Sequence, residues 1–199
     1  ALGADYLARQ DASTLLIVGS GRIAGLVAQA MRTVRPIQRV LVWNVRAAGA
    51  ESLAEGLRAQ GFDAQATTDL EAAARQADII SCATLSTVPL IQGAWLRPGT
   101  HLDLIGSFKP EMRETDAACF DGTTVYVDTD EAPTKSGDLL AAFEAGVLTR
   151  EAIQGDLHQL TTGQRPGRRD AQEITVFKAV GSALEDLTLA TLVYEAVNG

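Results

Sequence analysis

The sequence predicts an α/β fold of three layers, in which a doubly wound parallel sheet lies between two layers of helices. Short apolar runs alternate with stretches of helical periodicity from Leu15 to about Val127. The apolar runs are nearly continuous, which is typical of strands that helices cover on both faces. A glycine turn follows the first run directly, where folds of this class begin their first helix.

The first strand is predicted at Leu15–Val18, followed by a helix that continues to Val34. Residues of one helical face recur at the expected spacing, and Pro36 ends the helix; they are Ile23, Val27, Ala30, Met31 and Val34. The next elements alternate in the same way: a strand at Arg39–Trp43, a helix at Glu51–Gln60 before Gly61, a strand at Phe62–Ala66 and a short helix at Leu70–Ala77.

Four further strands complete the predicted sheet: Asp78–Ala83, His101–Ile105, Thr124–Val127 and Glu173–Lys178. The polar segment Gln164–Asp170 contains Pro and Gly and is interpreted as an exposed loop.

The last predicted helix, Ser182–Ala196, has apolar residues over most of its circumference, which implies burial on more than one side; they are Leu184, Leu187, Leu189, Leu192, Val193 and Val197. The opening stretch, with Leu2, Tyr6 and Leu7, resembles the tail of an amphipathic helix. Both ends of the chain are therefore expected to pack against a partner, which is either a second domain or another subunit.

Composition excludes several classes of function. The chain has 199 residues with 17 basic and 25 acidic side chains, and this net charge of −8 disfavours binding to nucleic acid. Its apolar runs are too short to span a membrane, and 46% hydrophobic residues suffice for one large core. The only two cysteines, Cys82 and Cys119, form no CxxC pair, so neither a disulfide framework nor a metal site is expected. Without a recognisable leader, a cytoplasmic setting is the expectation.

The glycine turn carries the strongest functional signal. It reads Gly19-Ser20-Gly21-Arg22-Ile23-Ala24, between the first predicted strand and helix. In a Rossmann-like fold the first glycine permits the tight turn, and the second lets the backbone approach a pyrophosphate, while the final small residue lets helix and strand pack closely. A dinucleotide site is therefore predicted; a purely structural turn is the alternative.

The choice between NAD and NADP depends on the end of the second strand. An acidic residue there would bind the ribose hydroxyls of NAD, but Asn44 stands 20 positions beyond Ala24 and Arg46 follows it. Arg46 could contact a 2′-phosphate, which slightly favours NADP. The alternative is that Arg46 is a solvent-exposed residue at the start of a helix.

By the fifth predicted strand, the sequence resembles the ornithine cyclodeaminase/mu-crystallin family. The matching segments follow in order along nearly the whole chain: Ala77–Ile80 with Ala83-Thr84, Trp95–His101, Ile105–Glu114 (IGSFKPEMRE), Gly137-Asp138 and Ile174–Asp186 (ITVFKAVGSALED). The resemblance implies that residues 1–199 are an NAD(P)-binding Rossmann domain with a returning C-terminal helix at about 182–197. A substrate domain, absent from this chain, would then carry the catalytic residues, and the full-length protein would be a homodimer acting on a small amino or imino acid.

The expected cofactor-binding residues combine the glycine turn, the ends of the strands and the family motifs. Val180 and Gly181 resemble the family position where the backbone meets the nicotinamide, although close packing between strand and helix is an alternative for Gly181. Arg22, in a turn that often reads Val-Gln in the family, lies either over the pyrophosphate or in solvent. The full set is Gly19, Ser20, Gly21, Arg22, Ile23, Asn44, Arg46, Ala83, Thr84, Gly106, Ser107, Val180 and Gly181.

One departure from the family pattern bears on the reaction. Cyclodeaminases carry an Asp in the loop after the fifth strand, and in this chain Phe108 occupies that position. An apolar ring cannot transfer a proton, and it cannot pair with an ammonium group as a carboxylate does. The sequence therefore favours an NAD(P)H-dependent reductase of cyclic imines, or an alanine dehydrogenase-type enzyme, over a cyclodeaminase. A binding protein without turnover, similar to mu-crystallins, is a further alternative.

Other polar residues are expected to be structural. His101 at the start of a strand is interpreted as structural, and His158 as a surface residue. Asp138 is interpreted as a helix N-cap. Asp103 either faces the cofactor cleft or bonds a neighbouring turn.

Overall fold

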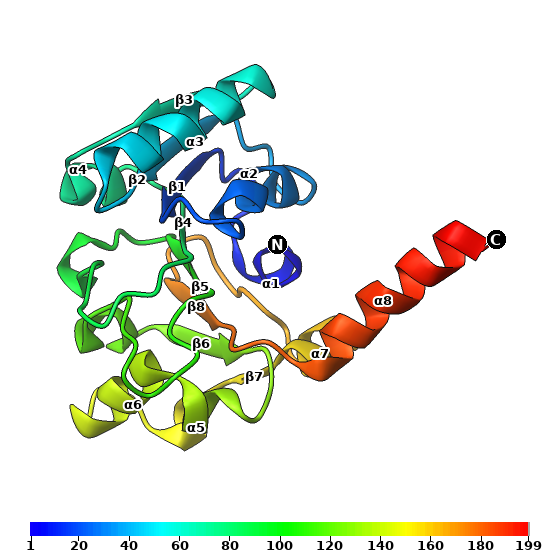
Figure 1. The fold of residues 1–199 in the computed structure, drawn as a ribbon. Helices are drawn as coiled ribbons and strands as arrows, with labels where there is room; N and C mark the ends of the chain where they lie inside the picture. Colours follow the sequence, from blue (N-terminus) through cyan, green and yellow to red (C-terminus); the bar gives the residue numbers. More distant parts are fainter. Residues whose placement is uncertain (199) are drawn as a thin grey trace.

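A computed structural model describes residues 1–198 and confirms the doubly wound α/β fold (Figure 1). In this part of the chain, eight strands form one sheet in the order β3-β2-β1-β4-β5-β8-β6-β7, and all neighbours are parallel. The strands are β1 (Thr14–Val18), β2 (Arg39–Trp43), β3 (Asp63–Ala66), β4 (Ile79–Cys82), β5 (His101–Leu104), β6 (Thr124–Val127), β7 (Gly155–Asp156) and β8 (Thr175–Lys178). Because β4 pairs with β1 on the side opposite β2, the strand order reverses between β1 and β4.

Helices cover both faces of the sheet. They are α1 (Leu2–Leu7), α2 (Ala24–Arg32), α3 (Ala47–Ala59), α4 (Leu70–Ala74), α5 (Ala132–Lys135), α6 (Gly137–Glu144), α7 (Leu157–Thr161) and α8 (Ala183–Asn198). Short 3-10 turns occur at Gly93–Trp95, Ala117–Phe120 and Arg150–Ala152. No helix in the described range is both long and apolar enough to cross a membrane.

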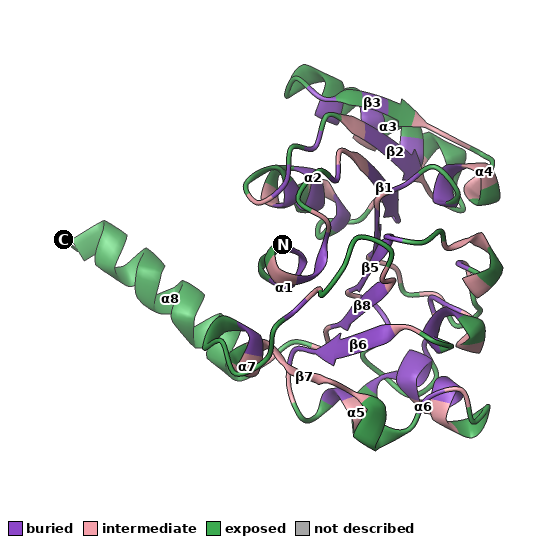
Figure 2. Cartoon of the chain, turned by 180° about the vertical axis from the view of Figure 1, so that it is seen from behind, coloured by how far each residue is buried: buried purple, intermediate pink, exposed green. Residues whose placement is uncertain are grey.

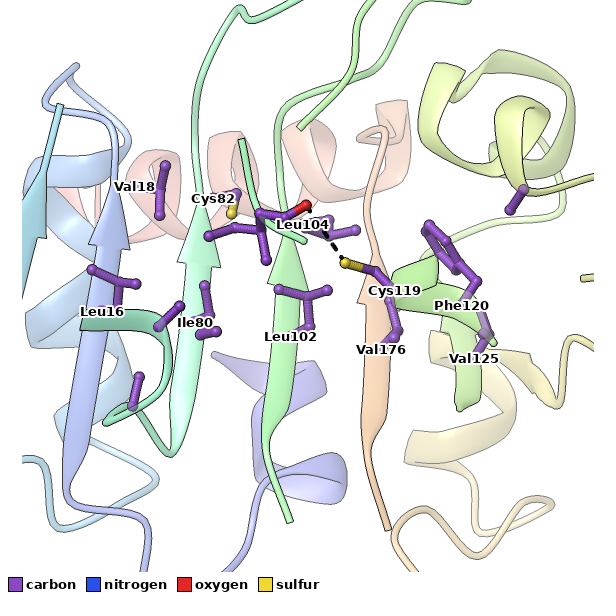
Figure 3. Packing of buried hydrophobic residues seen from close by; sticks show 14 of the residues in the cluster. Leu16, Val18, Ile80, Cys82, Leu102, Leu104, Cys119, Phe120, Val125 and Val176 are labelled. Atoms are coloured by element: carbon purple, nitrogen blue, oxygen red, sulfur yellow. Dashed lines mark hydrogen bonds between the residues drawn. The ribbon is translucent and has the colours of Figure 1, made fainter. Parts of the chain in front are cut away.

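The core consists of two main apolar layers, one on each face of the sheet. Successive residues of β1 alternate between the layers: Leu15 and Ile17 pack with α2 and α3, while Leu16 and Val18 pack with α4 and α6. Figure 3 shows the second layer, where the thiols of Cys82 and Cys119 are buried. Burial in this layer raises the pKa of the Cys82 thiol, which keeps it protonated.

The predicted strands are confirmed to within two residues, but the helices differ more. Helix α3 begins at Ala47, four residues before the predicted start. Its first turn contains Gly49, a residue type that disfavours helices and therefore hid this start in the sequence. Helix α2 ends at Arg32, and Ile23, predicted on the apolar face of this helix, precedes it with 54% of its surface exposed. The strand β7 and the short helix α5 were not predicted, since neither is long enough to show a periodic pattern.

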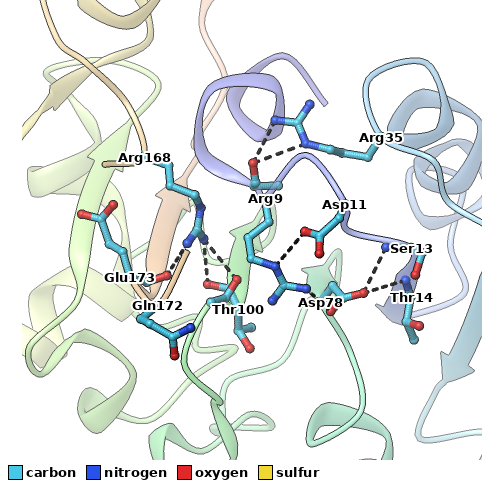
Figure 4. A network of polar contacts seen from close by, with 12 residues as sticks. Arg9, Asp11, Ser13, Thr14, Arg35, Asp78, Thr100, Arg168, Gln172 and Glu173 are labelled. Atoms are coloured by element: carbon cyan, nitrogen blue, oxygen red, sulfur yellow. Dashed lines mark hydrogen bonds and ion pairs between the residues drawn. The ribbon is translucent and has the colours of Figure 1, made fainter. Parts of the chain in front are cut away.

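The segment predicted as an exposed loop, Gln164–Asp170, is anchored to the sheet by Arg168. Arg168 donates hydrogen bonds to the backbone carbonyls of Leu7, Gly99 and Glu173 and to the hydroxyl of Thr175. Figure 4 shows this guanidinium among the segments that it joins. The loop is therefore exposed along most of its length but fastened to the sheet at Arg168.

Helix α8 projects away from the rest of the chain (Figure 1), and Figure 2 shows it exposed throughout. None of its described residues is buried, and seven large apolar side chains are 56% to 77% exposed. The helix lies where the sequence predicts it. The expectation of burial on more than one side is not met by contacts within residues 1–198.

Candidate functional site

A groove crosses the carboxyl edge of the sheet where the strand order reverses. It consists of two adjoining pockets of about 470 and 510 Å³ that share Gly21, Ala83, Thr84 and Leu85. The first pocket extends toward the end of β2, and the second toward the ends of β5 and β8. In open α/β sheets, ligands bind at this switch point.

The two glycines of the turn differ in what requires them. Gly19 has a φ of +117°, and a Cβ there would lie 2.6 Å from the carbonyl oxygen of Ala83. Its backbone N–H donates to the carbonyl of Trp43, which joins the turn to β2. Gly21, in contrast, would place a Cβ in open space with no atom within 4 Å. The fold therefore requires Gly19, whereas it leaves room for a side chain at Gly21.

The start of α2 presents backbone donors to the groove. Within residues 1–198, no hydrogen bond uses the backbone N–H of Gly21, Arg22 or Ile23. Free N–H groups at a helix N-terminus attract anions and suit phosphate. Together with the open space over Gly21, they form a cradle that fits a pyrophosphate, and the pockets on either side offer room for two nucleoside halves.

The end of β2 forms one wall of the first pocket. The side-chain amide of Asn44 donates to the carbonyl of Arg46, 3.2 Å away, and thereby shapes the turn into α3. A Cβ at Gly49 would approach Ser20 Oγ to 2.6 Å and Asn44 Nδ2 to 2.8 Å, so this glycine allows α3 to pack against the turn. The Arg46 side chain is exposed and forms no ion pair with any described residue.

Thr84 lies at the junction of the two pockets and is held from below by Glu114. One carboxylate oxygen of Glu114, Oε1, accepts hydrogen bonds from the backbone N–H of Thr84 at 2.7 Å and from its hydroxyl at 2.8 Å. Glu114 is completely buried, and burial raises the pKa of its carboxyl to about 7. An ionisable group with this environment next to a groove is typical of functional sites.

Gly106 and Lys178 continue this floor beneath the second pocket. A Cβ at Gly106 would lie 2.3 Å from Glu114 Oε1, so only glycine fits against the carboxylate. The buried ammonium of Lys178 donates to the carbonyls of Leu104 and Gly106, which ties β8 to the loop after β5. Burial lowers the pKa of Lys178, and the nearby charge of Glu114 opposes that shift.

The turn between β8 and α8 is held by Asp128. One oxygen of its buried carboxylate accepts from the backbone N–H groups of Val180 and Gly181, each at 2.7 Å. Gly181 has a φ of +83°, and a Cβ there would meet no atom within 4 Å. Its backbone conformation, rather than close packing, therefore explains the glycine.

The wall of the second pocket is mostly apolar. Ile23, Leu85, Ile105 and Phe108 line it, and Phe108 is 41% exposed. Two ionisable side chains also line this pocket within the described residues: Arg22 and Glu185. The pocket could hold a planar ring against apolar side chains, but it has few groups that could transfer a proton.

The structure brings twelve of the thirteen predicted site residues to the groove. The exception is Ser107, which lines neither pocket. Its φ of +55° turns the buried side chain inward, where Oγ donates to the carbonyl of Met112 and accepts from the N–H of Asp138. This residue shapes the loop after β5 from the inside.

Of the other polar residues, Asp138 corrects a prediction. Ser136 caps α6, whereas Asp138 is buried in its first turn and accepts from the N–H groups of Glu114 and Thr115. Asp103 bonds Ser81 on the adjacent strand, which neither alternative anticipated. His101 is buried at the amino end of β5, and His158 is exposed on α7, as predicted.

Sequence reasoning missed Glu114, Lys178 and Asp128 as parts of the site. All three are charged residue types that are mostly found at the surface, so the pattern gave no sign of their burial. Glu114 was nevertheless within a family motif, and Lys178 ended a predicted strand. A charged residue inside a family motif, or at the end of an apolar strand, was the signal that could have identified Glu114 and Lys178.

Comparison with known proteins finds a family model that matches the chain. The model of the ornithine cyclodeaminase/mu-crystallin family matches residues 1–199. A Delta(1)-pyrroline-2-carboxylate reductase of Paracoccus denitrificans is 45% identical over 203 residues, which cover 100% of this chain and 63% of that protein. The chain spans 61% to 63% of the length of the first curated relatives that it matches.

Solved structures agree with the fold. The Thermococcus litoralis Delta(1)-pyrroline-2-carboxylate reductase in complex with NADH and L-proline has a TM-score of 0.95 and 32% identity, over 98% of this chain and 61% of that chain. An archaeal alanine dehydrogenase dimer with bound NAD has a TM-score of 0.92 and 29% identity, over 98% of this chain and 60% of that chain.

Proposed function

The chain belongs to the ornithine cyclodeaminase/mu-crystallin family, and from this premise we propose that it is the NAD(P)-binding part of a reductase of small cyclic imino acids. The observation that carries the proposal is the groove at the switch point, with free N–H groups at the start of α2 and open space over Gly21. The similarity to Delta(1)-pyrroline-2-carboxylate reductases supports this substrate class.

In this proposal the residues of the groove bind and orient a nicotinamide dinucleotide. The backbone around Gly21 holds the pyrophosphate, the pocket at the end of β2 holds the adenosine half, and the pocket beside Thr84 and Gly106 holds the nicotinamide half. The bound cofactor supplies a hydride. The apolar side chains around Phe108 provide a surface against which a ring can pack on the face where a substrate would lie.

Phe108 supports reduction rather than deamination. By the resemblance to the family, Phe108 stands where cyclodeaminases carry an Asp, and its ring lines the second pocket. A carboxylate there could pair with a substrate amine, but an aromatic ring can only pack against one. Reduction of an imine needs no such carboxylate on this side of the groove. An alanine dehydrogenase-type reaction uses the same features and is a second candidate, supported by the archaeal alanine dehydrogenase.

The remaining parts of the protein are also proposals. The groups that grip a substrate carboxylate and the catalytic residues would belong to a substrate domain outside residues 1–199, against which α8 would pack. The full-length protein would be a cytoplasmic homodimer, and the exposed Arg46 at the end of β2 slightly favours NADP over NAD. Equilibrium titration with NADPH and NADH side by side would decide between these cofactors.

An assay of the full-length protein tests the function. We expect consumption of NADH or NADPH with Delta(1)-pyrroline-2-carboxylate, and no release of ammonia from ornithine. Ammonia release without net consumption of the cofactor would replace the reductase by a cyclodeaminase. Cofactor binding without turnover of cyclic imines, or of pyruvate with ammonia, would instead favour a mu-crystallin-like binding protein.

A further inference from the structure

Glu114 is placed to act on the groove although it lines neither pocket. Its Oε1 accepts two hydrogen bonds from Thr84, one of the residues that both pockets share, and lies against the α-carbon of Gly106. The other oxygen, Oε2, is buried without a hydrogen-bond partner among the described residues. Glu114 is therefore a charge-bearing group directly beneath the floor of the second pocket, with one oxygen free to take a proton.

Charged groups face Glu114 from several elements. Lys178 on β8 is attractive to its carboxylate and Asp138 on α6 is repulsive, while Asp128 after β6 also acts on Lys178. The thiol of Cys82 on β4 is held neutral by burial. No ion pair within 4 Å joins Glu114 to Lys178 in residues 1–198. The attraction between the two charges therefore acts over a longer distance than a direct contact.

We propose that Glu114 is a positioning residue whose charge, held beneath Thr84 and Gly106, sets the preference of the groove between oxidised and reduced nicotinamide. The inference rests on the proposed function, because it assumes that the second pocket holds the nicotinamide. The oxidised ring carries a positive charge and the reduced ring carries none. An ionised Glu114 therefore stabilises the oxidised form selectively, and a protonated Glu114 leaves Lys178 to disfavour it.

The pKa of Glu114, raised by burial to about 7, makes this preference depend on pH near neutrality. Above that value the carboxylate is ionised and favours NAD⁺. As the pH falls through it, the carboxyl becomes protonated and binding of NAD⁺ weakens relative to NADH. By linkage, binding of NAD⁺ near pH 7 releases a fraction of a proton, whereas binding of NADH takes up none or releases less.

The experiment measures the dissociation constants of NAD⁺ and NADH for the full-length protein between about pH 6 and about pH 8. In the wild type, we expect the ratio of the NAD⁺ constant to the NADH constant to rise about three- to tenfold as the pH falls. In Glu114→Gln, which keeps an oxygen for Thr84 but removes the charge, the ratio is expected to be high and constant.

Two further variants separate charge from structure. Thr84→Val removes one hydrogen bond that lowers the pKa of Glu114 but leaves the carboxyl in place, so the pH dependence of the ratio should persist with its midpoint at a higher pH. Glu173→Gln removes a buried carboxylate that bonds Thr124 and Arg169 just before β8, away from the groove, and should behave as the wild type. Thermal unfolding of each variant identifies effects on folding alone.

The outcomes are distinct from those that test the function. A ratio that is independent of pH in the wild type overturns the inference, even if Glu114→Gln fails to fold. A pH dependence that survives in Glu114→Gln also overturns it, while binding of both nucleotides leaves the proposed function standing. If neither nucleotide binds, the proposed function fails, and this inference fails with it.

Discussion

Gly19 and Gly21 lie two residues apart, and the structure gives them different roles. At Gly19, a positive φ and the nearby carbonyl of Ala83 exclude any side chain. At Gly21, the backbone and the surroundings would both accept one. In a turn of this spacing, the second glycine is the one whose backbone a pyrophosphate approaches, and the contrast between the two glycines can be measured.

Gly21→Asp should abolish binding of the cofactor without affecting folding. The new carboxylate would project into the open space of the groove and repel a pyrophosphate, so we expect at least about a hundredfold loss of affinity, or ~3 kcal/mol. Its melting temperature should stay close to that of the wild type. Gly19→Ala is the matched variant and should lower stability, since its Cβ would collide with Ala83. Unchanged affinity in Gly21→Asp would remove the turn from the site.

His101 makes stability depend on pH without contributing to the site. Burial lowers its pKa from 6.5 to about 3, and its Nδ1 lies 2.9 Å from Thr175 Oγ1. Below about pH 6.5 the unfolded chain binds a proton that the folded chain excludes, so the contribution of His101 to stability is lost progressively as the pH falls toward 3.

His101→Gln should remove this pH dependence. Between about pH 8 and about pH 5, the wild type should lose about 2 kcal/mol of unfolding free energy relative to the variant. Urea unfolding at the two pH values measures the difference. Glu114 contributes with the opposite sign, because its raised pKa favours the folded state on acidification, but it does so equally in both proteins and cancels. Equal losses in the two proteins would contradict the low pKa of His101.

At the scale of elements, polar side chains join segments that are far apart in the chain. Arg168 connects the loop before β8 to α1 and to the loop before β5. Arg35 after α2 and Asp78 before β4 act in a similar way near the amino end of the sheet (Figure 4). The carboxyl edge, which carries the groove, is held by Glu114, Lys178 and Asp128. Both edges of the sheet thus depend on buried charges.

Arg168→Met should destabilise the fold by at least about 2 kcal/mol, because several buried carbonyl groups would lose their donor. Arg75→Met is the control: Arg75 forms an exposed pair with Glu71 on α4, and its loss should cost at most about 0.5 kcal/mol. Chemical denaturation measures both values. Equal effects would show that the loop is not fastened at Arg168.

At the scale of the whole molecule, α8 buries none of its residues against the rest of the described chain, residues 1–198. Its apolar side chains are exposed over its whole length. The helix follows β8 directly in the chain. Burial of such a helix normally supplies much of its stability. The described chain therefore has a buried core beneath the groove and an exposed apolar surface on α8.

Removal of α8 tests this view. The 199-residue chain shortened after Ser182 should unfold at nearly the same temperature as the longer chain, because the removed helix has no buried residue. It should also bind less of a dye that reports exposed apolar surface. Removal of the same helix from the full-length protein should lower stability, if α8 packs there. A lower melting temperature for the shortened 199-residue chain would contradict the lack of contacts.

The strands were predictable because continuous apolar runs between helical stretches have few other solutions. The glycine turn was predictable for a different reason: the spacing of its glycines is the spacing that a tight turn and an open backbone require. The boundaries of α2 and α3 were less predictable, since Ile23 lines the groove and Gly49 lets α3 pack against the glycine turn. Asp138 was misinterpreted because its partners, Glu114 and Thr115, lie more than twenty residues away in the chain.

By itself, the sequence determined the parallel α/β fold, the strand positions and the glycine turn, because these follow from periodicity and from local backbone conformation. Only the tertiary structure showed that Glu114 and Lys178 lie under the groove and that Ser107 turns away from it. The physical reason is that burial and the pairing of charges depend on contacts between distant segments. A local pattern of residues therefore does not indicate which of its charged side chains will be buried.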